Sequence, residues 1–265
     1  MEQPNKNIKL VANKKSRVIL PNILTLIGVC IGLTSIKFAF DGKFELSIIA
    51  VIVAGIIDGL DGRIARLIQG TSKVGKELDS LTDVISFGVA PAFIMYFWSM
   101  SEIGRLGWLI SLIYVVCVAL RLARFNVNSE AEPSWRDNFF EGIPSPAGGI
   151  LVLMPLIYSF SEIQFFKPNY QIVVPALFIL IAILLISKVP TYSLKKIVVP
   201  RSTTIFLLFV VVLFFGLLLI YTFNTLIISG ILYLIIIPVS SVHFLLIKKN
   251  NKIKDDSTDH HEDVL

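Results

Sequence analysis

Four aspartates occur as two spaced pairs between residues 58 and 83. Asp58 and Asp61 are three residues apart, and Asp79 and Asp83 are four residues apart. On α-helices both spacings place the two carboxylates on one face, about 5–6 Å apart at Cβ. Each pair lies at the end of an apolar segment, and a short loop joins the two segments. Antiparallel packing of two such helices would therefore bring all four carboxylates together.

A cluster of this kind favours a divalent cation. Four negative charges held close together repel one another and lose water, which is costly near a bilayer. Carboxylate oxygens are ligands that suit Mg²⁺ or Mn²⁺. We therefore expect Asp58, Asp61, Asp79 and Asp83 to hold one or two such ions. Two ions a few ångströms apart form a clamp for displacement reactions at phosphorus.

The residues between the two pairs suit a ligand that carries phosphate. Gly62, Ala65 and Gly75 are small, so a neighbouring helix or a ligand can approach the backbone closely. Arg66 supplies positive charge. The alternative is a cation-coupled transporter, because carboxylates within membrane helices also relay protons or cations. Transporters often show repeat symmetry between their halves, and we find no internal repeat in this sequence.

The rest of the chain is typical of a protein that lies in a bilayer. Its 265 residues are 55% hydrophobic and 16% charged, whereas a soluble domain has about 25% charged residues. Apolar blocks of about 20 residues can cross a membrane as helices. The sequence predicts an all-α, polytopic transmembrane bundle of about eight spans, near residues 18–40, 46–63, 82–99, 106–120, 150–160, 172–186, 203–221 and 226–247.

Basic residues are distributed unevenly between the two ends of these predicted helices. With the N-terminus in the cytoplasm, the inner side holds all of the 24 lysines and arginines except Lys37, Lys43, Arg105 and Lys167. This is the positive-inside bias of membrane proteins. We therefore expect an inner-membrane protein whose termini and aspartates face the cytoplasm. The same bias explains the net charge of +5 without a nucleic-acid partner.

The sequence predicts one transmembrane domain with a polar segment at each end. Residues 1–17 are basic, residues 18–247 contain the predicted spans, and residues 248–265 are charged and polar. We expect the last segment to be a disordered cytoplasmic tail. The first apolar block is too long for a signal peptide and lacks a small-residue cleavage site, so it is interpreted as a retained helix. Cys30 and Cys117 fall within predicted spans and indicate no disulfide framework.

The segment from Asp58 to Asp83 resembles the signature of the CDP-alcohol phosphotransferases, D-x2-D-G-x2-A-R-x8-G-x3-D-x3-D. Every fixed position is matched, by Asp58, Asp61, Gly62, Ala65, Arg66, Gly75, Asp79 and Asp83. The run Pro21-Asn22-Ile-Leu-Thr25 also resembles the first helix of this family.

This resemblance implies roles for the matched residues. Asp58, Asp61 and Asp79 would bind metal and the CDP pyrophosphate, and Asp83 would be the general base and contact a second ion. The nucleotide site would be lined by Thr25, Asp61, Gly62, Ala65, Arg66 and Gly75. The family core has six spans, so the last two predicted here would be an addition. The resemblance also implies a homodimer.

Two further segments bear on the acceptor alcohol. Arg121-Leu-Ala-Arg124-Phe-Asn126 and Gly142-Ile-Pro144-Ser-Pro146 resemble segments of membrane-embedded phosphatidylserine synthases. The resemblance implies transfer of the phosphatidyl group of CDP-diacylglycerol to L-serine, with Arg121, Arg124 and Asn126 at the serine site. Arg121 and Arg124 share one helical face and could bind a carboxylate. From spacing alone they could also be ordinary flanking arginines. The alternative reaction uses glycerol 3-phosphate and gives phosphatidylglycerophosphate.

Overall fold

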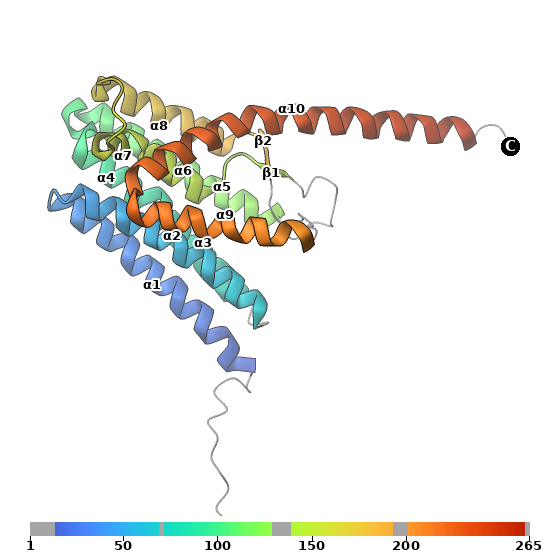
Figure 1. Cartoon of the computed structure of the whole chain (residues 1–265), viewed down its shortest axis with the longest axis horizontal. Coiled ribbons are helices and arrows are strands. Elements are labelled where there is room, and N and C mark those ends of the chain that lie inside the picture. The colour runs from blue at the N-terminus through green and yellow to red at the C-terminus, as the bar shows by residue number, and fades with distance from the viewer. Residues whose placement is uncertain (1–13, 69–71, 129–138, 193–200, 263–265) are drawn as a thin grey trace, which may run out of the picture. The chain divides into compact units, whose positions relative to one another are not determined.

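The computed structural model describes residues 14–68, 72–128, 139–192 and 201–262, and these residues are almost entirely helical (Figure 1). The chain forms two compact units, Met1–Leu122 and Ala123–Leu265. The all-α class predicted from composition is therefore confirmed.

The first unit is built from long helices that meet around a central helical rod. α1 (Lys14–Phe40) and α2 (Phe44–Leu67) form a hairpin, whose turn contains Gly42 at a φ of 74°. The rod consists of α3 (Lys73–Asp83), a π-helical segment η1 (Val84–Val89) and α4 (Ala90–Trp98). A short 3-10 turn η2 (Met100–Ile103) then leads into α5 (Arg105–Asn128), whose first part completes the unit.

Small residues let α1 and α2 pack closely against each other and against the rod. A Cβ at Gly32 would lie 2.6 Å from Oγ of Ser86, and one at Gly28 would lie 3.3 Å from Cγ2 of Thr82. The Ser47 hydroxyl of α2 donates to the carbonyl oxygen of Ser35 in α1. The Ser47–Ser35 contact joins α1 and α2 near their turn, and the contacts of Gly28 and Gly32 hold α1 against the rod close to Asp83.

The second unit contains helices of very different lengths and one small sheet. It comprises the end of α5, β1 (Phe139–Glu141), α6 (Ser145–Val152), α7 (Met154–Phe160), α8 (Tyr170–Ile186), β2 (Pro190–Tyr192), α9 (Arg201–Ile220) and α10 (Thr222–Glu262). β1 and β2 pair in antiparallel fashion, with Phe140 opposite Thr191. Gly142 follows β1 at a φ of 73°, and a Cβ there would lie 2.8 Å from the Leu185 carbonyl oxygen. This position therefore requires glycine.

Five helices among the described residues are long and apolar enough to cross a membrane. They are Ile19–Phe40, Lys73–Trp98, Arg105–Val127, Thr203–Ile220 and Thr222–Ile247. The other three predicted spans are also helical, but α2 carries charged residues near its end, α8 has 17 residues, and the block at 150–160 is divided between α6 and α7. The chain is thus a multi-pass membrane protein, and the total of eight spans stays a prediction.

The two terminal segments differ in how far the structure describes them. Residues 1–13 of the basic N-terminal segment lie outside the described residues, and α1 begins at Lys14. α10 continues to Glu262 and so includes most of the segment for which composition predicted disorder (Figure 1). That residues 248–265 form a disordered cytoplasmic tail stays a prediction.

Candidate active site

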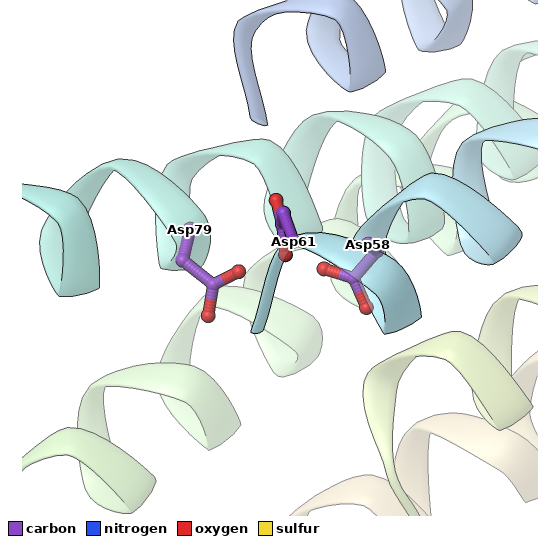
Figure 2. A group of neighbouring side chains, drawn as sticks. All are labelled: Asp58, Asp61 and Asp79. Atoms are coloured by element: carbon purple, nitrogen blue, oxygen red, sulfur yellow. The ribbon is translucent and has the colours of Figure 1, made fainter. Parts of the chain in front are cut away.

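α2 and α3 bring the predicted aspartates together. Asp58 and Asp61 lie near the C-terminal end of α2, and Asp79 lies on α3. One carboxylate oxygen from each of these three residues lies within 4.8 Å of the other two. Figure 2 shows the three side chains turned toward one another from the two helices. The spacing argument from the sequence therefore predicted their convergence correctly.

Asp83 joins the same group at the last residue of α3. The Asp58 carboxyl lies within hydrogen-bonding reach of both the Asp79 and the Asp83 carboxyls. Asp83 also interacts electrostatically with Arg121, which is 8% exposed on α5. We refer to Asp58, Asp61, Asp79 and Asp83 as the carboxylate cluster. Carboxylates that approach so closely need a proton or a cation between them.

The chemistry of the carboxylate cluster fits a metal ion. Within the described part of the chain, Oδ1 of Asp61 and Oδ1 of Asp83 are buried without a hydrogen-bond partner. A buried polar oxygen without a partner is costly, and a cation bound by Asp58, Asp61 and Asp79 could supply one to Asp61. The donors are all carboxylate oxygens, which hard divalent ions such as Mg²⁺ and Mn²⁺ prefer. Asp58, Asp61 and Asp79 are placed to hold one ion, with Asp83 beside them.

Thr25 of α1 makes a contact that the sequence did not predict. It is 4% exposed, its hydroxyl donates to Oδ2 of Asp61 at 2.7 Å, and it lies 3.0 Å from the carbonyl oxygen of Pro21. Thr25 therefore fixes one oxygen of Asp61 and leaves Oδ1 available for a ligand. Its direct contact with a nucleotide stays a prediction.

The small residues of the signature have two different environments. A Cβ at Gly75 would lie 2.9 Å from Oδ1 of Asn22 and 3.1 Å from Oγ of Ser72, so glycine permits α1 to approach the start of α3. Gly62 is exposed, and a Cβ there would meet nothing within 4 Å among the described residues. Packing therefore explains Gly75 and leaves room for a ligand at Gly62.

Two other signature residues lie beside Gly62 on α2. Ala65 is half-buried, whereas Arg66 is exposed and donates from Nε to the Gly62 carbonyl oxygen at 3.1 Å. The Arg66 guanidinium is thus held near the open backbone at Gly62.

Sequence reasoning missed Ser72, whose side chain accepts from the Gly75 N–H at 2.9 Å and caps α3. A serine directly before the first residue of a helix, three positions ahead of the N–H that it accepts from, is a recognisable signal for such a cap.

The predicted serine-site residues have different surroundings. Arg121 lies in the first unit with the carboxylate cluster. Arg124 belongs to the second unit, where Nη1 donates at 2.8 Å to the carbonyl oxygen of Ile186 at the end of α8. Asn126 is half-buried near the end of α5. Arg124 thus has a structural partner, which uses one of the five guanidinium N–H groups.

Comparisons with known proteins agree with the signature. The family model for CDP-alcohol phosphatidyltransferase matches residues 18–185. A CDP-diacylglycerol–serine O-phosphatidyltransferase of Mycobacterium leprae is 44% identical over 137 residues, 51% of this chain and 45% of the relative. The enzyme of the same name from Helicobacter pylori (strain ATCC 700392 / 26695) is 36% identical over 179 residues, 68% of this chain and 74% of the relative.

An archaeal relative carries a related name. An archaetidylserine synthase of Methanothermobacter thermautotrophicus is 34% identical over 142 residues, 52% of this chain and 57% of the relative. The chain spans about half the length of the mycobacterial relatives that it matches.

Neutralising a single member of the carboxylate cluster should weaken metal binding. Asp61→Asn and Asp79→Asn each remove one anionic ligand, so we expect the dissociation constant for Mn²⁺, measured by titration of the purified protein, to rise at least roughly tenfold. Asp41→Asn is the matched control, because Asp41 is exposed and pairs with Lys37. Unchanged affinity in both cluster variants would contradict a shared ion site.

The Thr25 hydroxyl should matter through Asp61. Thr25→Val keeps the shape of the side chain but removes the hydrogen bond, so we expect Mn²⁺ affinity to fall roughly tenfold, as is usual when the partner of a metal ligand is lost. Thr25→Ser retains the hydroxyl and should bind Mn²⁺ like the unaltered protein. If valine and serine at this position gave equal affinities, the orienting role of Thr25 would be wrong.

Proposed function

The chain belongs to the CDP-alcohol phosphatidyltransferase family, and on that premise we propose that it transfers the phosphatidyl group of CDP-diacylglycerol to the hydroxyl of L-serine, giving phosphatidylserine and CMP. The observation that supports this most directly is the convergence of Asp58, Asp61 and Asp79, with ligand oxygens within 4.8 Å of one another. Such a site suits the pyrophosphate of an activated lipid.

The choice of serine as acceptor is supported by the relatives and by the arginines of α5. The Mycobacterium and Helicobacter relatives are named for serine transfer, and the Methanothermobacter relative for archaetidylserine synthesis. Free serine carries a carboxylate that an arginine can bind through paired hydrogen bonds. Arg121, Arg124 and Asn126 are the residues that we propose for this role. None of these names favours glycerol 3-phosphate as the acceptor.

The reaction needs a base and compensation of negative charge. When bound by Asp58, Asp61 and Asp79, Mg²⁺ or Mn²⁺ supplies positive charge to the pyrophosphate and to the departing CMP. Asp83 takes the proton from the serine hydroxyl as its oxygen attacks the β-phosphorus. A bond forms between the serine oxygen and this phosphorus. The bond from phosphorus to the bridging oxygen breaks, and its electron pair leaves with CMP.

The residues around the carboxylate cluster assist by position. Thr25 keeps Asp61 oriented, and Arg121 lies close enough to Asp83 to interact with its carboxylate. Gly62 and Arg66 offer an open stretch of backbone and a guanidinium to the nucleotide, and Ala65 and Gly75 complete the proposed nucleotide site.

The location of the reaction follows from the charge bias of the sequence. We place the carboxylate cluster and both termini on the cytoplasmic side of the inner membrane, where soluble serine meets a lipid whose acyl chains remain in the bilayer. The homodimer that the family resemblance implies stays a prediction.

A product assay tests the proposed function. Protein purified in detergent is mixed with CDP-diacylglycerol, Mn²⁺ or Mg²⁺, and either serine or glycerol 3-phosphate, and CMP and the lipid product are measured. We expect serine-dependent release of CMP together with phosphatidylserine. Asp83→Asn should lower kcat by a factor on the order of 10² to 10⁴, because the base acts in the chemical step.

Other outcomes of this assay are equally decisive. CMP release with glycerol 3-phosphate alone would replace the proposed acceptor, and a protein that releases no CMP with either alcohol would reject the proposed function. Normal turnover by Asp83→Asn would reject its role as the base.

The role of Arg124 can be separated from its contact with α8. Loss of a charged hydrogen bond to serine is worth about 1.5–3 kcal/mol, so we expect Arg124→Ala to raise the KM for serine roughly ten- to a hundredfold and to leave the KM for CDP-diacylglycerol nearly unchanged. Arg124→Lys should restore serine affinity only in part, because lysine lacks the planar fork. Equal losses for both substrates would mean that Arg124 chiefly holds the end of α8.

A further inference from the structure

The helical rod of the first unit changes its hydrogen-bonding pattern immediately after Asp83. α3 ends at Asp83, η1 runs from Val84 to Val89, and α4 follows without a break. At the end of η1, the Ala90 N–H donates to the carbonyl oxygen of Ile85, five residues earlier. Such π-helical insertions are rare in proteins as a whole, and many of those that occur lie at functional sites. The residues before η1 are therefore rotated relative to those after it.

Pro91 provides a physical cause for this change. In a regular α-helix the N–H of residue 91 would donate to the carbonyl oxygen of Phe87, but proline has no N–H and its ring clashes with that carbonyl. Pro91 is buried at the start of α4, so water cannot relieve the loss. The wider π-helical turn accommodates the proline ring.

Tyr114 of α5 supplies the missing donor. Its side chain is 0% exposed, and its hydroxyl donates to the Phe87 carbonyl oxygen at 2.7 Å. A buried tyrosine hydroxyl needs such a partner, and the carbonyl that proline leaves without its helical donor needs one as well. The hydrogen bond from Tyr114 thus stabilises the helix in its π-helical form.

η1 is also fixed on its other sides. A Cβ at Gly55 of α2 would lie 3.4 Å from the Phe87 ring, so this ring packs against the helix that carries Asp58 and Asp61. A Cβ at Gly88 would lie 3.2 Å from Val118 of α5. Ser86 approaches α1, with its hydroxyl 3.5 Å from the Gly28 carbonyl oxygen. η1 is therefore the place where α1, α2 and α5 meet the rod.

We propose that Tyr114 is a positioning residue for the catalytic centre: its hydrogen bond to the Phe87 carbonyl holds the π-helical turn, and this turn sets the rotation at which Asp79 and Asp83 face Asp58. One residue of an α-helix corresponds to about 100° of rotation and about 1.5 Å of rise. Loss of the π-helical turn would therefore move the Asp83 carboxylate away from its partners. The consequence for turnover rests on the proposed function; the consequence for metal binding does not.

Two substitutions distinguish positioning from packing. Pro91→Ala restores an N–H that can close a regular α-helical turn onto the Phe87 carbonyl, and Tyr114→Phe removes only the hydroxyl. For Pro91→Ala we expect an unfolding temperature equal to or above that of the unaltered protein, because a proline leaves a helix. We nevertheless expect kcat to fall roughly ten- to a hundredfold, as for other misplacements of about 1 Å. If Pro91 and Tyr114 serve only packing, kcat per folded molecule should stay unchanged.

Tyr114→Phe should lower kcat in the same direction, with KM for CDP-diacylglycerol changed by less than about threefold. Both variants should bind Mn²⁺ several-fold more weakly, because Asp79 and Asp83 precede η1. Tyr158→Phe is the matched control: its hydroxyl also donates to a backbone carbonyl, that of Phe166 at 3.0 Å, but in the second unit. It should retain both kcat and Mn²⁺ affinity.

The outcomes separate the two proposals. If the unaltered protein releases no CMP with serine, the proposed function fails, and the Mn²⁺ titration alone decides the role of Tyr114. If the unaltered protein is active and both variants keep its kcat and Mn²⁺ affinity per folded molecule, the positioning role is overturned. If the variants give less folded protein but keep a normal kcat, Tyr114 serves packing and not positioning.

Discussion

Mutual repulsion among partly buried carboxylates is the constraint on which the first unit depends. Asp58, Asp61 and Asp79 present oxygens within 4.8 Å of one another, and Asp83 lies within reach of Asp58. Each added negative charge raises the cost of the others, and partial burial removes the water that would screen them. Arg121 beside Asp83 and the Thr25 hydroxyl on Asp61 offset part of this cost. A divalent cation bound by these carboxylates would offset the remainder and would at the same time create a site for pyrophosphate.

Close helix packing maintains this unfavourable arrangement. Glycines at positions 28, 32 and 75 bring α1 against the rod, and Gly55 brings α2 against Phe87. Because the backbones approach so closely, the polar ends of α1, α2 and α3 cannot separate to relieve the repulsion without losing apolar contacts. In our proposal the π-helical turn after Asp83 adds a second restraint, since it sets the rotation at which Asp79 and Asp83 face α2.

The sequence predicted those features that follow from local spacing. Helical periodicity was enough to place Asp58 with Asp61 and Asp79 with Asp83, and a short connection between apolar segments was enough to bring the pairs together. Contacts between distant residues were not predictable in this way. Thr25 and Asp61 are 36 positions apart, and nothing in either residue type identifies the other as its partner. Pro91 signals an irregular helix, but a kink, a break or a π-helical turn could each accommodate it.

Arg124 shows a second limit of prediction from the sequence, namely the choice between two partners that suit the same side chain. Its spacing from Arg121 suggested a shared carboxylate ligand, whereas the structure pairs it with the Ile186 carbonyl oxygen. Both contacts suit a guanidinium, so residue type alone could not distinguish them.

The most direct measurement of the central claim, that the carboxylate cluster holds a divalent cation, is anomalous X-ray scattering from crystals of the purified protein grown with Mn²⁺. We predict a peak bounded by the carboxylates of Asp58, Asp61 and Asp79; a well-ordered carboxylate cluster with no peak at saturating Mn²⁺, or a peak bound elsewhere in the chain, would contradict it.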